Sequence, residues 1–106
     1  LQLIVSTTGI EDEIEGTVTS YKLYDAYPNP FNPTTSIKYE LGSSQFVSLK
    51  VYDVLGNEIA TLVNEEKATG IYEVRFNVSN DLTSGVYFYR LEAGSYSETK
   101  KMLLMK

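Results

Sequence analysis

The side chains that begin most enzyme reactions are missing from this chain. Its 106 residues contain no histidine and no cysteine, which removes the commonest general base, the thiol nucleophile, any disulfide and the usual zinc ligands. The glycines form neither a phosphate-binding loop nor a dinucleotide-binding fingerprint. A glycosidase needs only two carboxylates, but the candidates stand at turns or strand ends, where acids are ordinary solvated residues: Asp53, Glu58, Asp81 and Glu92. We therefore expect no catalytic activity and no cofactor.

Tyrosine is the other residue type that could build a site, with nine tyrosines against four phenylalanines and no tryptophan. Tyrosine suits a half-buried pleated surface, with its ring packed and its hydroxyl in water. The absence of tryptophan favours this interpretation over an accessory carbohydrate-binding module. That alternative would need a flat stacking platform made by Tyr52, Tyr72, Tyr87, Tyr89 and Tyr96.

The charges are unevenly distributed along the chain. Residues 1–20 hold four acids and no base, which accounts for −4 of the net charge of −5, so residues 21–106 are nearly neutral and show no basic face for nucleic acid. The spacing of these acids is not that of a calcium loop, which favours a solvated linker over a calcium site. Asn77-Val78-Ser79 also matches the N-glycosylation pattern. The four acids are Glu11, Asp12, Glu13 and Glu15.

The C-terminus is the one basic segment, because Lys100, Lys101 and Lys106 lie within seven residues that contain no acid. Two interpretations are open. Adjacent lysines protect an edge strand against further pairing. A basic terminus with apolar residues such as Met105 is also a surface that another protein captures, including by strand addition.

The stretch Tyr27–Thr35 must position whatever lies around it, because it holds all three prolines of the chain, Pro28, Pro30 and Pro33. A proline fixes its own φ, lacks an N–H and restricts the residue before it. The stretch is therefore neither helix nor central strand. We predict a stiff, ordered start of a β domain, with Phe31 as its apolar plug and with Asn29 and Asn32 available for side-chain bonds to nearby backbone.

Beyond residue 20, runs of strand length alternate with turn residues. Apolar and polar residues alternate over 35–41 and 46–53, which predicts a hairpin. A helix over 58–67 is an alternative, but the segment is short and uncapped, so a strand is preferred. The run 86–93 is apolar on both faces at its start, which predicts a central strand covered on both sides. The predicted strands are 21–24, 35–41, 46–53, 59–63, 70–77, 86–93 and 96–105.

Seven short strands in about 86 residues, with no helix, predict an all-β fold: an immunoglobulin-like antiparallel β-sandwich over residues 21–106. Residues 9–20 are interpreted as an acidic linker and residues 1–8 as the last strand of a preceding passenger domain. Because the chain begins at Leu1 and not at methionine, we expect it to be a processed product or a fragment. No apolar run is long enough to span a membrane, so no membrane insertion is expected.

Four segments together resemble the type A C-terminal sorting domain of the type IX secretion system. They are YPNPFNPTTSIKYEL at 27–41, LKVYDVLGNEIATL at 49–62, SGVYFYRLEAG at 84–94 and the ending TKKMLLMK. The resemblance runs from about residue 21 to residue 106. It implies a folded, non-catalytic signal at the end of a larger exported protein of Gram-negative bacteria of the Bacteroidetes group and relatives.

The resemblance also implies partners and site residues. The partners are the outer-membrane export machinery, a covalently attached N-terminal passenger and a sortase-like protease that removes the domain. The passenger would travel through the periplasm to the cell surface or be secreted. A structural spacer beside a secreted enzyme is a further alternative. The family's recognition motifs fall on Pro28, Asn29, Pro30, Gly85, Tyr87, Lys100, Lys101, Met105 and Lys106.

Overall fold

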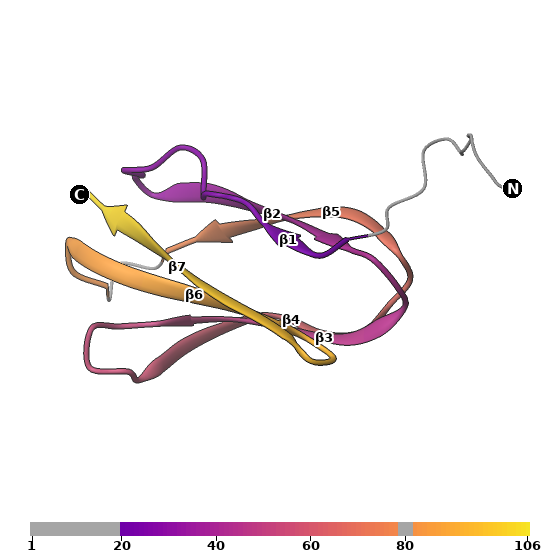
Figure 1. Ribbon diagram of the computed structural model, residues 1–106. Helices are drawn as coiled ribbons and strands as arrows, with labels where there is room; N and C mark the ends of the chain where they lie inside the picture. The colour runs from indigo at the N-terminus through magenta and orange to yellow at the C-terminus, as the bar shows by residue number, and fades with distance from the viewer. Residues whose placement is uncertain (1–19, 79–81) are drawn as a thin grey trace, which may run out of the picture.

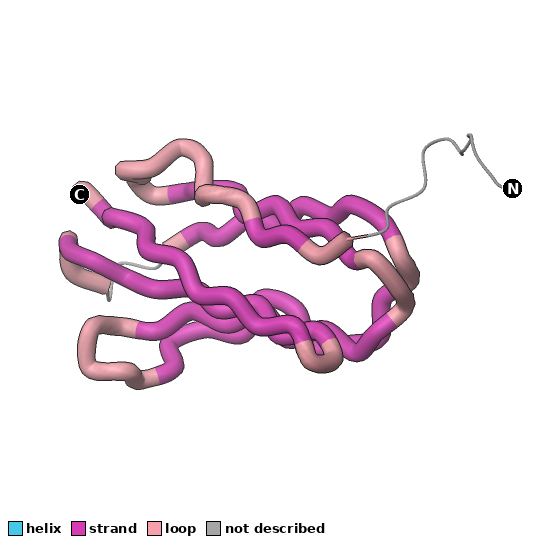
Figure 2. The backbone as a smooth tube through the Cα atoms, in the orientation of Figure 1, coloured by secondary structure: helices cyan, strands magenta, loops and turns pink. Residues whose placement is uncertain are grey.

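The computed structural model describes residues 20–78 and 82–106, which form seven strands and no helix (Figures 1 and 2). In this part of the chain there is no helix that could cross a membrane. Each of the seven strands predicted between residues 21 and 105 is present, with ends shifted by a few residues. The strand and linker predicted for residues 1–8 and 9–20 lie outside the described residues, apart from Ser20. The strands are β1 (Lys22–Leu23), β2 (Thr34–Leu41), β3 (Gln45–Tyr52), β4 (Glu58–Lys67), β5 (Gly70–Asn77), β6 (Gly85–Ala93) and β7 (Tyr96–Leu104).

The strands form two antiparallel sheets that face each other, which confirms the predicted β-sandwich (Figure 1). One sheet has the order β1-β2-β5 and the other the order β4-β3-β6-β7. Because β4 pairs with β3, the predicted strand over 59–63 is a strand, and the helical alternative is wrong. It extends to Lys67, four residues further than the apolar residues indicated.

The core lies between the sheets and is built by the predicted alternation. On β2 the inward residues Ile37 and Leu41 are fully buried, and Lys38 between them is exposed. Leu49 on β3 and Leu91 on β6 lie opposite each other in the ladder, and both are fully buried. Burial of such side chains contributes about 1.5 to 3 kcal/mol each, so the packing of one sheet on the other is the main stabilising interaction.

The prediction that the strand over 86–93 is central is confirmed, but the prediction that it is covered on both sides is wrong. β6 hydrogen-bonds to β3 on one side and β7 on the other. Its outward residues Val86 and Phe88 are only half-buried. The physical reason is that a two-layer sandwich has nothing packed on its outer faces, so apolar residues there remain partly in water.

The two ends of the sandwich differ in what they carry (Figure 1). The proline loop 27–33, the β3–β4 turn, the start of β6 and the C-terminus gather at one end, which we call the proline end. The described chain begins at the other end, the Ser20 end, where the ring of Tyr21 stacks on Tyr96 at a centroid distance of 5.3 Å. The chain thus enters the fold and leaves it at opposite ends.

Candidate recognition surface

The proline loop is closed at its base and anchored in the core. The backbone amides of Tyr27 and Ser36 each donate to the other residue's carbonyl, at 3.0 and 2.9 Å. The buried Thr35 hydroxyl donates to the carbonyl of Pro28 at 2.8 Å. Phe31 is 2 % exposed and its ring lies 6.2 Å from that of Phe76, so the predicted plug is confirmed.

The loop also binds the outer edge of β7, the last strand. The amide of Phe31 donates to the carbonyl of Leu103 at 2.9 Å, and the amide of Met105 donates to the carbonyl of Phe31 at 3.0 Å. The side chain of Asn29 adds two bonds, accepting from the Leu103 amide at 2.9 Å and donating to the Lys101 carbonyl at 3.4 Å. We call these four bonds the edge clasp. A short piece of loop thereby takes the place that a neighbouring strand would occupy.

Asn29 therefore acts differently from its predicted role. A bond to nearby backbone was expected, but its amide group bonds to backbone more than 70 residues away in the chain. Thr35 closes the base of the loop instead. The side-chain oxygen of Asn29 is thus available to accept from the amide of Leu103, an edge donor that would otherwise face water.

The C-terminal residues divide between the seam of the sandwich and its surface. Lys100 lies on the inward face of β7, where its ammonium group is 3.2 Å from a carboxylate oxygen of Asp25. Lys101 points outward and is exposed, and Met105 is 54 % exposed. The amide of Lys106 donates to the hydroxyl of Ser84 at 2.9 Å. The predicted edge position of this strand is confirmed, with the clasp covering its final third.

Gly85 and Tyr87 lie beside these residues, because β6 pairs with β7 in the register Gly85↔Leu104 and Tyr87↔Met102. Tyr87 is 5 % exposed, and its hydroxyl donates to the carbonyl of Thr83 at 2.7 Å. Its ring therefore packs inside the sandwich. It holds the loop before β6 in position and offers no large contact surface of its own.

The carboxylates considered for catalysis have structural partners. Asp53 accepts from the amides of Leu55 and Asn57, both at 2.9 Å. Glu58 lies 3.3 Å from the Lys50 ammonium group, and Glu92 lies 3.7 Å from Arg90. No group of three metal-ligating side chains occurs in residues 20–78 and 82–106. Asp81, Ser79 and the acids of 11–15 lie outside the described residues.

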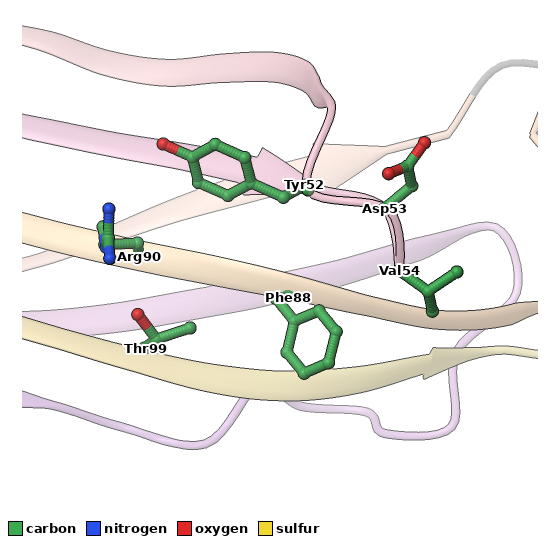
Figure 3. A pocket seen from close by; sticks show the side chains of 7 residues that line it. Tyr52, Asp53, Val54, Phe88, Arg90 and Thr99 are labelled. Carbon is green, nitrogen blue, oxygen red and sulfur yellow. The ribbon is translucent and has the colours of Figure 1, made fainter.

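The five tyrosines do not form one platform. Tyr89 is fully buried, and its hydroxyl donates to the carbonyl of Tyr24 at 2.7 Å. Burial raises its pKa to about 12. Tyr72 lies in the other sheet, where its ring stacks on that of Tyr39 from the neighbouring strand at a centroid distance of 5.4 Å. Since Tyr52 projects from the outer face of β3, the rings point into different parts of the molecule (Figure 3).

Two exposed apolar residues beside the motif residues were not singled out from the sequence. Val54 and Leu55 form the tip of the β3–β4 turn and are 65 % and 82 % exposed. Val54 borders a shallow hollow on the outer face, together with Phe88 and Arg90 (Figure 3). The available signal was the pair Val-Leu directly before Gly56, because turn tips are ordinarily polar.

The sequence comparisons agree with the resemblance seen in the motifs. A family model described as "Secretion system C-terminal sorting domain" matches residues 25–105. Among curated proteins, no match to the chain was found. The matched range includes the proline loop, all of β2 to β7 and Met105.

Proposed function

The chain belongs to the family of secretion system C-terminal sorting domains, and we propose that the export machinery reads it at the proline end of the sandwich. Domains of this family are sorting signals for type IX secretion and are not catalytic. The family implies a passenger attached on the N-terminal side, the type IX machinery as partner, and export to the cell surface or secretion.

In the finer proposal, the passenger crosses the periplasm and meets an outer-membrane translocon. A sortase-like protease then separates it from residues 21–106. The translocon contacts Pro28, Asn29 and Pro30 together with the exposed C-terminal residues Lys101, Met105 and Lys106. Gly85, Tyr87 and Lys100 position these residues, since Gly85 and Tyr87 pair with β7 and Lys100 is engaged at the seam.

One observation carries the proposal: three motifs far apart in sequence meet at one end of the fold. The edge clasp joins Asn29 to β7. The Ser84 hydroxyl accepts from the Lys106 amide, directly beside the start of β6. Three segments that bond to one another in this way can be read as a single folded surface.

Deleting the last seven residues would not test this proposal cleanly, because Met102 and Leu104 are fully buried. Such a deletion removes part of the core along with the signal. Large-to-small changes at buried positions cost about 2 to 5 kcal/mol each, so a loss of export would report unfolding as readily as lost recognition.

A charge reversal at an exposed position separates the two effects. We expect Lys101→Glu, in the full chain fused behind a periplasmic reporter, to reduce surface export in a type IX host by about three- to tenfold. Its melting temperature should stay close to that of the parent protein. The matched control is Lys22→Glu, an exposed cation of the other sheet at the Ser20 end, which should export normally. Equal export of both variants would contradict the proposed surface.

A further inference from the structure

We propose that the β3–β4 turn is a further contact of the sorting signal, with Leu55 as an apolar anchor that enters an apolar pocket of the export machinery. This inference rests on the proposed function. It adds residues outside the recognition motifs, within the segment 49–62 that resembles the family.

The first argument is the exposure of this turn. Leu55 is 82 % exposed and its neighbour Val54 is 65 % exposed. Two adjacent large apolar side chains in water at a turn tip give no folding stability, because they bury almost no area. Neighbouring exposed apolar residues of this kind mark interaction sites more often than isolated ones do.

The second argument is the rigidity with which the turn holds them. The carboxylate of Asp53 accepts from the amides of Leu55 and Asn57, and the amide of Asp53 donates to the carbonyl of Asn57 at 3.0 Å. The amide of Gly56 donates to the carbonyl of Asp53 at 3.0 Å. Gly56 has φ of +87°, a conformation that glycine adopts without a steric cost. A turn whose backbone is already held in place loses less entropy on binding, which favours an anchor role for the residue at its tip.

The third argument is continuity with the proposed recognition surface. A groove runs from Leu55 to the start of β6, with Val54 and Leu55 on one side and Ser84, Gly85 and Val86 on the other. Val86 also borders a second hollow, which Asn29, Lys101 and Leu103 line. The turn, the start of β6 and the edge clasp thus form one uninterrupted surface at the proline end.

The fourth argument is charge. Lys101 lies beside this apolar surface and has no acidic ion-pair partner within the described ranges. The acid of the groove lining is Asp53, on the turn, where its carboxylate accepts bonds from the turn amides. The surface is therefore apolar with the cation of Lys101 at its β7 border, and it fits a partner pocket that is apolar with an acidic group facing Lys101.

The test compares Leu55→Ser with two matched controls, in the full chain fused behind a secreted reporter in a type IX host. Phe46→Ser and Ile71→Ser remove large apolar side chains that are also exposed, by 52 % and 55 %, but lie at the Ser20 end. We expect Leu55→Ser to lower the exported fraction at least about tenfold, as loss of an anchor residue does. Both controls should export within about twofold of the parent.

Leu55→Met serves as the conservative variant and should export normally. Thermal melting of each purified chain tests folding, and Leu55→Ser should melt within a few degrees of the parent because its side chain is exposed. Parent-like export of Leu55→Ser, or an equal loss in Phe46→Ser, would overturn the inference. If the parent fusion itself is not exported, the proposed function fails instead, so the two failures are distinguishable.

Discussion

At the scale of single residues, one carboxylate of this domain builds a turn. The residue is Asp53, on which four donors at the β3–β4 turn depend. Its carboxylate accepts from Leu55, Asn57 and the Asn57 side chain, and its carbonyl accepts from Gly56. The pKa of Asp53 is held below its usual value of 3.8, first by the bond from the Asn57 amide and then by those from the Asn57 side chain and the Leu55 amide.

This lowered pKa predicts an acid-dependent contribution to stability. The folded state binds the Asp53 proton less tightly than the unfolded state, so the contribution is complete above pH 3.8 and is lost as pH falls through the lower folded pKa. An asparagine side chain at this position would titrate no proton, so we expect the free energy of unfolding of Asp53→Asn to approach that of the parent below pH 4. Urea titrations of both proteins from pH 7 to pH 2 measure this. A difference in unfolding free energy between the parent and Asp53→Asn that stays constant with pH would contradict the lowered pKa of Asp53.

At the scale of elements, the notable feature is that a loop takes over the role of a strand. The edge of β7 ends against Asn29 and Phe31, where the carbonyl of Lys101, the amide and carbonyl of Leu103 and the amide of Met105 find partners. Unpaired edges invite association with other chains. The clasp therefore limits strand addition to the part of β7 before Lys101, and the capture of the terminus by strand addition would require the clasp to open.

The clasp predicts a local change in hydrogen exchange when Asn29 is replaced. In Asn29→Ala the amide of Leu103 loses its acceptor, and its exchange should become at least about tenfold faster. The amide of Met102, which faces the β6–β7 ladder, should stay protected. The cost to global stability should be below about 1 kcal/mol because the bonds are exposed. Exchange followed by NMR checks this, and unchanged exchange at Leu103 would refute the clasp.

The elements were predictable from the sequence where one face is buried. Ile37, Tyr39 and Leu41 alternate with polar residues because the sandwich needs a period of two on β2. The end of β4 was not predictable, since Glu65 and Glu66 lie on an edge strand where no apolar residue is required. The Asn29 contact was equally hidden, because it joins residues more than 70 positions apart and leaves no periodic trace.

At the scale of the whole molecule, stability depends on a core in which tyrosine has a large share. Tyr39 and Tyr89 are fully buried and Tyr96 is half-buried. Burial raises the pKa of all three, to about 12 for Tyr89 and Tyr96. The folded core therefore favours the neutral phenols over the phenolates.

This sets an alkaline limit to the fold. An unfolded tyrosine ionises near pH 10, so the stabilisation by the neutral buried form is complete below pH 10 and is lost as pH rises through about 12. We expect the free energy of unfolding to fall steeply over this range. Tyr89→Phe should lessen the fall while lowering stability at pH 8 by about 1 to 2 kcal/mol, because the Tyr24 carbonyl loses its donor. A flat pH profile in the parent would contradict this account.

The placement of the chain ends has a further consequence for how such a signal is used. The described chain begins at the Ser20 end, and the proposed contacts all lie at the proline end (Figure 1). A cargo joined directly before Ser20 would be separated from the docking face by the length of the sandwich. We therefore expect the size, shape and charge of the cargo to have little effect on docking, so that one sorting domain of this design can serve unrelated cargoes.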